Sequence, residues 1–243
     1  MKFKDKIYDF LLFCGDIHSI IDVIPNYLKN NELNNCAVFQ VGDFGIGFDN
    51  DHKENRRMNY LNERMKNYNS DLYIIRGNHD NPKYFDGTYN LSNLFLLKDY
   101  SEVEINYLNI LCIGGAISVD RIERKGYWDE KKTHDYWKDE SIVFDEERLK
   151  EFRYIDIVVT HSAPNFCYPL SIGGIEKWIS KDEELNDDVL VERNNLTMMY
   201  EILSKNNKLQ NWYYGHFHKD VISYNSDTKF TALGINSIVE KRI

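Results

Sequence analysis

Five short polar clusters, each placed directly after a strand-like apolar run, constrain this chain more than any other feature. The most distinctive is Arg76-Gly77-Asn78-His79-Asp80, which follows the apolar run Leu72–Ile75 and precedes the turn signal Asn81-Pro82. The others are Gly15-Asp16-Ile17-His18, Gly42-Asp43, Thr160-His161 and Gly215-His216-Phe217-His218. Open α/β sheets bind ligands at the edge where their strands end. We therefore expect the five clusters to meet in one site.

The segments between the clusters predict an α/β fold. Strand-like runs cover Tyr8–Cys14, Ala37–Val41, Leu72–Ile75, Leu94–Leu97, Leu108–Ile113, Ile155–Thr160, Trp212–Tyr214, Val221–Ser223 and Phe230–Leu233. Helical patterns cover Ile20–Lys29, where Pro25 delays the regular helix, and Asn50–Tyr68, Asp145–Phe152 and Asp188–Lys205. Strand and helix alternate in the first half, which predicts parallel strands, whereas the brief connections of the second half predict antiparallel pairs. We expect two β-sheets packed face to face, with helices outside.

Length and hydropathy set the expected class. We expect one domain over residues 1–243, because the candidate site residues extend from Asp16 to His218. No apolar run approaches the ~20 residues that span a bilayer. Lys2–Lys6 and Phe10–Cys14 faintly imitate a signal peptide, but the apolar run is short and no cleavage site follows. A cytoplasmic protein with no membrane partner is the expectation.

Charge and cysteine content narrow the class further. The net charge of −9 and the pI of about 5.3 argue against tight, non-specific binding of long nucleic acid. The four cysteines form no C-x-x-C pair, so we expect buried thiols in a reducing compartment rather than disulfides or a zinc ribbon.

The side chains of the clusters are those that bind divalent metal ions. Each has an ordinary alternative: Asp16 as a helix cap, Asp43 as a turn residue, and a lone histidine as a surface residue. The combination favours a metal site, because five of the seven histidines follow strands together with two aspartates and an asparagine. Mixed ligands of this kind suit Mn, Fe, Zn or Ni. The set exceeds what one tetrahedral ion uses, so two ions that share a carboxylate fit it better: Asp16, His18, Asp43, Asn78, His161, His216 and His218.

The order GDIH, GD, RGNHD, TH, GHFH resembles the calcineurin-like metallophosphoesterase family over nearly the whole chain. The resemblance implies two mixed β-sheets packed face to face and flanked by helices, around two divalent ions. It implies one ion held by Asp16, His18, Asp43 and His218, and a second held by Asp43, Asn78, His161 and His216. Asp43 would be the bridging ligand. It also implies that His79 is the general acid for the leaving oxygen and that Asp80 orients it.

Departures from the family pattern bear on the substrate. Arg76 resembles the phosphate-contacting arginine that precedes GNH in Ser/Thr protein phosphatases. The segment Gly42–Phe48 lacks the arginine of their second block, and their late His-Gly-Gly element is absent. The pattern is closer to family members that act on phosphodiesters, including nucleotide phosphodiesterases.

A further segment begins with Gly114–Arg121 and resembles a group of small bacterial and phage phosphoesterases. It continues with cations and aromatic rings that suit phosphate and a base: Arg124, Lys125, Tyr127, Trp128, Lys131, Lys132, Tyr136, Trp137 and Lys138. The alternative is a solvated amphipathic segment whose tryptophans pack on the core. Arg121, nearest the preceding strand, is the candidate for substrate binding.

The expected function is a metal-dependent phosphoesterase in which a metal-bridging hydroxide attacks phosphorus in line. Small nucleotide-type phosphodiesters are the expected substrates, and manganese is the favoured metal. The alternatives are a phosphomonoesterase or protein Ser/Thr phosphatase, a nuclease, and a non-catalytic scaffold of the same fold. The sequence leaves the oligomeric state open.

Overall fold

Two mixed β-sheets form the centre of the fold in a computed structural model that describes residues 6–125, 136–170 and 174–242. The five-stranded sheet has the order β11-β1-β2-β3-β4, and the six-stranded sheet has the order β5-β6-β7-β8-β10-β9. The strands of the first sheet are β1 (Phe10–Cys14), β2 (Cys36–Gln40), β3 (Asp71–Ile74), β4 (Leu94–Leu96) and β11 (Ile238–Lys241). Those of the second are β5 (Ser101–Ile105), β6 (Leu108–Ile113), β7 (Ile157–Thr160), β8 (Asn211–Tyr214), β9 (Val221–Asn225) and β10 (Thr228–Ala232).

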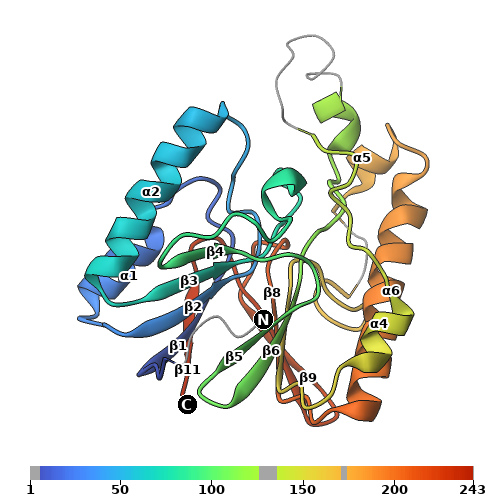
Figure 1. Cartoon of the computed structure of the whole chain (residues 1–243). Coiled ribbons are helices and arrows are strands. Elements are labelled where there is room, and N and C mark those ends of the chain that lie inside the picture. The colour runs from blue at the N-terminus through green and yellow to red at the C-terminus, as the bar shows by residue number, and fades with distance from the viewer. Residues whose placement is uncertain (1–5, 126–135, 171–173, 243) are drawn as a thin grey trace.

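Helices cover the outer faces of both sheets (Figure 1). They are α1 (Val23–Asn30), α2 (Asp51–Asn67), α4 (Glu146–Glu151) and α6 (Leu185–Asn206), while the short helix α5 (Glu176–Ile179) packs beside α6. Figure 1 shows α1 and α2 on one side and α4 and α6 on the other. The expected sandwich of two mixed sheets between helices is confirmed.

Alternation along each strand builds the layers. Leu11 and Phe13 of β1 belong to the core between the sheets, whereas Leu12 and Cys14 belong to the core under α1 and α2. In β7, Val159 faces the other sheet in the same way. Because both faces of the central strands are buried, these strands are continuous apolar runs rather than alternating ones.

Local sequence explains where the helices begin. The side chain of Asn50 caps α2 by accepting a hydrogen bond from the Lys53 amide at 3.1 Å. Asp145 caps α4 in the same way, through the Arg148 amide at 3.0 Å. Helix α1 begins at Val23, which leaves Pro25 in the first turn, where a missing N–H is tolerated.

The second sheet differs from the prediction. Strands β6, β7, β8 and β10 are parallel to one another, and the expected antiparallel pairs occur only at the edges of the described sheet, between β5 and β6 and between β9 and β10. Strands β5 and β11 were also not predicted. β5 forms a hairpin with β6 through Asn106 and Tyr107, whose φ values of 48° and 71° suit a two-residue turn.

Two expectations from the sequence, on the cysteines and on membrane-spanning helices, can be compared with the structure. Cys14, Cys36, Cys112 and Cys167 are free and buried, as predicted. Within the described residues, no helix has the length and apolar character needed to cross a bilayer.

Candidate metal centre

The candidate ligands lie on the loops that follow β1, β2, β3, β7 and β8. Four of them occupy the left-handed region of backbone space, with φ of 41° at His18, 54° at Asp43, 67° at His216 and 54° at His218. Residues other than glycine rarely adopt such angles, and they concentrate at functional sites where the surrounding structure holds them. Ten other non-glycine residues of the described chain also have positive φ, so this conformation occurs at four candidate ligands without being confined to the site.

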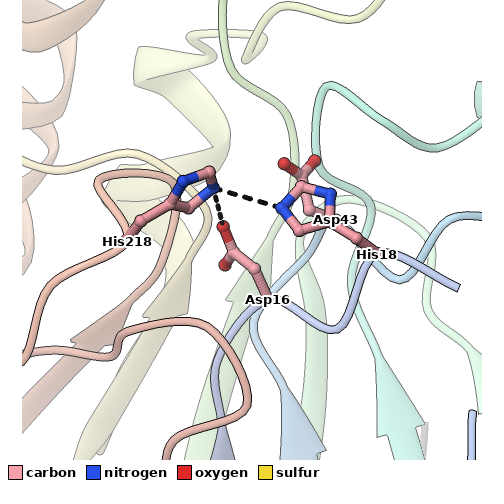
Figure 2. Close-up of side chains that lie close together, drawn as sticks. All are labelled: Asp16, His18, Asp43 and His218. Carbon is pink, nitrogen blue, oxygen red and sulfur yellow. Dashed lines mark hydrogen bonds and ion pairs between the residues drawn. The ribbon is translucent and has the colours of Figure 1, made fainter. Parts of the chain in front are cut away.

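The first ligand group brings together both ends of the chain. Asp16, His18, Asp43 and His218 each offer one ligand atom, and these atoms lie within 4.8 Å of one another. The His218 Nε2 is 3.1 Å from the Asp16 carboxylate and 3.1 Å from the His18 Nε2, as Figure 2 shows. Asp16 also accepts the His216 amide proton, at 3.1 Å, which fixes the loop after β8 against the loop after β1.

The second ligand group shares Asp43 with the first. Asp43, His161 and His216 offer ligand atoms within the same limit of 4.8 Å. The His161 Nε2 is 3.1 Å from Asp43 Oδ1 and 3.1 Å from Asn78 Oδ1. The structure therefore assembles both sets of residues that the family resemblance implied, with Asp43 between them.

Close backbone approach at Gly42 makes this arrangement possible. Gly42 has a φ of +101°, and a Cβ at this position would lie 2.5 Å from the His161 Nδ1. Only glycine combines this backbone conformation with the required space.

The electrostatics of the second group couple Asp43 to His161. Burial raises the pKa of Asp43, but the charge and the hydrogen bond of His161, with the smaller effects of His79 and His216, together outweigh burial and hold that pKa below its ordinary value. Burial lowers the pKa of His161, while Asp43 raises it by charge and by hydrogen bonding, and the net direction is upward. Burial and repulsion from His161 lower the pKa of His216 to about 3. His216 is therefore neutral at pH 7.

The donor set fits divalent ions of the borderline class. His161 Nδ1 lies 2.8 Å from the Val41 carbonyl and donates its proton there, which leaves Nε2 facing Asp43 and Asn78. A hydrogen bond at the far nitrogen is the usual arrangement for a metal-binding histidine. The clustered imidazole and carboxylate groups are a suitable environment for two such ions: Asp16, Asp43 and His161 are buried, His18 and His216 are partly buried, and His218 is exposed.

His79 lies at the edge of the centre with a cation beside it. Its Nε2 is 3.9 Å from Asp43 Oδ2, and the Arg124 guanidinium contacts both ring nitrogens, with 3.1 Å to Nδ1. Burial and the charge of Arg124 lower the pKa of His79 to about 4, against the opposing effect of Asp43. From the sequence, Arg121 rather than Arg124 was the candidate for substrate binding. The two lie three residues apart on the helical turn of residues 121–125, and contacts with distant residues distinguish them.

Asp80 has a different role from the one expected. Its fully buried carboxylate accepts hydrogen bonds from four backbone amides, of Gly77, Phe44, Gly45 and Ile46, at 2.7–3.1 Å. Among the described residues, no hydrogen bond joins it to His79. Asp80 therefore connects the loop after β3 to the loop after β2 and positions Asp43 and Asn78, rather than orienting the imidazole.

Ser118 and Glu140 fix the orientation of the Asn78 amide. Asn78 Nδ2 donates to Ser118 Oγ at 3.1 Å, and Ser118 Oγ donates to Glu140 Oε2 at 2.8 Å. Glu140 Oε1 also accepts the Ser118 amide proton at 2.7 Å. Because the nitrogen of the amide is held by Ser118, the oxygen Oδ1 faces His161 and the centre. This is the structural role of the Gly114–Arg121 segment.

Ser118→Ala is expected to weaken metal binding at the second group about 10–100-fold, the usual effect of losing a partner that orients a metal ligand. In the variant, Asn78 Nδ2 has lost the Ser118 hydroxyl that accepts its hydrogen bond, so the side-chain amide of Asn78 is no longer held with its oxygen toward the centre. Isothermal titration with Mn²⁺ measures the change. Ser101→Ala, on β5, is the matched control and should titrate like the wild type. Unaltered binding in Ser118→Ala would contradict the orienting role.

The structure does not place Arg76 or Arg121 at the centre, which corrects both substrate-binding expectations. Arg76 pairs with Asp99 at 2.8 Å and donates to the carbonyls of Asp139, Glu140 and Ser141. Arg121 pairs with Asp182 and Asp188, at 2.5 and 2.6 Å. Arg76 thus holds the segment that carries Glu140, and Arg121 connects the loop after β6 to the α6 region.

The structure describes only part of the aromatic and basic segment that follows Arg121. Tyr127, Trp128, Lys131 and Lys132 lie outside the described residues. Trp137 is buried, and its ring meets Phe48 edge to face with centroids 5.2 Å apart. For this tryptophan, the alternative of packing on the core is the one observed.

The family model described as calcineurin-like phosphoesterase matches residues 11–220. A comparison with curated proteins gives no significant match. A putative 5′-nucleotidase from Staphylococcus aureus, solved in complex with alpha-ketoglutarate, shares 10% identity with a TM-score of 0.48; the match covers 95% of this chain and 50% of that one. This chain therefore spans about half the length of the Staphylococcus protein.

Two further solved structures are similar over most of their length. The phosphopantetheinyl hydrolase of Mycobacterium tuberculosis shares 11% identity with a TM-score of 0.41, covering 95% of this chain and 92% of that one. An archaeal phosphodiesterase shares 12% identity with a TM-score of 0.39, covering 93% and 84%. The family model alone spans most of the chain and includes every candidate ligand. The protein belongs to the calcineurin-like phosphoesterase family.

Proposed function

We propose that this protein is a phosphoesterase that uses two divalent metal ions, with manganese favoured, to hydrolyse phosphodiesters of small nucleotide-type molecules. The observation that carries the proposal is the pair of ligand groups joined at Asp43. Two bound divalent ions polarise phosphoryl oxygens and lower the pKa of water at neutral pH. Membership of the family supports the reaction class.

The residues around the centre have separable roles in this proposal. Asp16, His18, Asp43 and His218 hold one ion, and Asp43, Asn78, His161 and His216 hold the other. Arg124 lies beside His79 at the edge of the centre and pairs with Asp120 at 2.8 Å; its guanidinium supplies a cation for the phosphoryl group. His79 delivers a proton to the leaving oxygen once the anionic phosphoryl group, bound beside it, offsets the charge of Arg124 and raises the lowered pKa of the imidazole.

The alternatives receive less support. The argument for a protein Ser/Thr phosphatase rested on Arg76, whose guanidinium is occupied by Asp99 and three carbonyls. A non-catalytic scaffold would tolerate loss of ligands, but every candidate ligand is present and held in place. The acidic net charge of −9 disfavours a nuclease that acts on long substrates.

Removing the metal tests the proposal. The protein should hydrolyse bis(4-nitrophenyl) phosphate faster than 4-nitrophenyl phosphate in the presence of Mn²⁺. Chelation should reduce both rates to background, and added Mn²⁺ should restore them, because the reaction depends on the ions. Faster hydrolysis of the monoester would support the phosphomonoesterase instead. Turnover that persists in metal-free protein would reject the whole mechanism.

A further inference from the structure

A cavity of about 340 Å³ lies directly beside the metal centre. His216 and His218, one from each ligand group, form part of its lining. Val119 from the loop after β6, Val189 from α6 and Phe217 from the loop after β8 give it apolar walls. Its volume and largely apolar lining are those of a small-molecule site. A phosphoryl group at the centre would therefore lie at the edge of this cavity.

The charges around the cavity do not suit a second phosphate. Arg193 is the cation in the lining, but its guanidinium donates four hydrogen bonds to backbone carbonyls, of Ala163, Pro164, Cys167 and Pro169. Away from the ligand groups, the other ionisable side chains of the described lining are Tyr168 and the acid Glu192, which is only 5% exposed. Within the described lining, the Arg193 donors are therefore bound to main-chain oxygens, and a second anion would lie against the carboxyl group of Glu192.

Glu192 is suited to a neutral polar partner. Burial raises the pKa of its carboxyl group to about 7, against the opposing effects of Ser162, His161 and Arg193. A carboxyl group near its pKa can both donate and accept hydrogen bonds. One such group in an apolar cavity gives orientation to a flat organic ligand that carries polar edge atoms.

We propose that this cavity binds the uncharged, flat organic group of the phosphoester substrate, an aryl group or a nucleobase, while the phosphoryl group occupies the metal centre. The proposal rests on the proposed function and narrows its substrate class. Esters with an uncharged aromatic group are favoured over esters with a small alkyl group, and over compounds with a second phosphate.

Phosphonates test the cavity without requiring turnover. Calorimetry of the Mn²⁺-loaded protein should show that phenylphosphonate binds about tenfold more tightly than methylphosphonate, because only the ring reaches the cavity. Val189→Phe narrows the cavity and should reduce this preference to within about twofold. Val191→Phe is the matched control on the same helix, since Val191 is 56% exposed and does not line the cavity, and it should keep the preference.

A second variant tests the width of the cavity independently, and a second ligand tests the requirement for an uncharged group. Val119→Phe narrows the cavity from the loop after β6 and should act like Val189→Phe. Wild-type protein should bind 4-carboxyphenylphosphonate several-fold more weakly than phenylphosphonate, and Glu192→Gln should reduce that difference. Equal binding of the carboxylated and plain rings by the wild type would overturn the requirement for an uncharged group.

The outcomes separate this inference from the proposed function. Equal binding of phenylphosphonate and methylphosphonate, or a preference that survives both narrowing variants, would overturn the cavity assignment even if the protein hydrolyses esters. A selective response to the ring in protein that hydrolyses no ester would support the cavity assignment and reject the proposed function.

Discussion

Asp43→Asn is expected to remove both metal ions and to lower kcat/KM by about 10³-fold or more, which corresponds to about 4 kcal/mol of transition-state stabilisation. Asp43 is the member common to both ligand groups, so a single substitution affects two sites. The amide retains the size of the carboxylate and can still accept the His79 amide hydrogen bond, now 2.7 Å long. The variant should therefore fold, and the loss should come from the missing charge.

Metal content per chain and kcat/KM measured in Mn²⁺ check this expectation together. Asn78→Ala provides the comparison, because Asn78 belongs to the second group alone, and it should lower the metal content from two ions to one. Asp49→Asn is the matched control, since this exposed carboxylate pairs with Lys53 outside the centre. Two ions retained in Asp43→Asn would show that Asp43 does not bridge them.

The ligand positions could be predicted because local sequence determines them. Each polar cluster follows a strand that is buried on both faces and is therefore recognisable as an apolar run. Glycines such as Gly42 mark the places where the backbone turns closely beneath the ligands. Parallel strands bring the loops that follow them to one edge of a sheet, so residues placed just after such strands in the sequence can be predicted to lie close together.

The roles of the charged neighbours could not be predicted, because distant contacts decide them. Arg121 and Arg124 lie three residues apart on one helical turn, and the sequence does not show which faces the centre. Asp182 and Asp188, from the α6 region, bind Arg121. Arg124 is left beside His79.

Asp80 was misassigned for a similar reason. Its position next to His79 in the sequence indicated a pair, but amides of the loop after β2 bind its carboxylate instead.

The parallel strands of the second sheet, by contrast, could have been predicted from the sequence. The connection between Ile113 and Ile157 is long enough for a crossover, which parallel strands require. The short connections on either side of β9 instead favoured the prediction of antiparallel pairs.

His79 should matter only where the leaving group needs a proton. With a weak leaving group such as an alkoxide, His79→Ala is expected to lower kcat by about 10²–10⁴-fold, the usual contribution of a general acid. With 4-nitrophenolate, which departs as a stable anion, the loss should stay below about tenfold. His79 belongs to neither ligand group, so the variant should keep its metal content.

The position of His79 explains why leaving-group dependence is the informative measurement. The ring contacts Arg124 and lies 3.9 Å from Asp43, so its removal also changes the charges at the edge of the centre. A purely electrostatic role would slow both classes of ester by a similar factor. Two diesters that share an ethyl group, ethyl 4-nitrophenyl phosphate and diethyl phosphate, separate the two roles, because the first loses 4-nitrophenolate and the second loses ethoxide. His52→Ala, at an exposed position of α2, is the matched control and should leave both rates unchanged. Equal losses on the two diesters would reject the general acid and assign His79 to phosphoryl binding with Arg124.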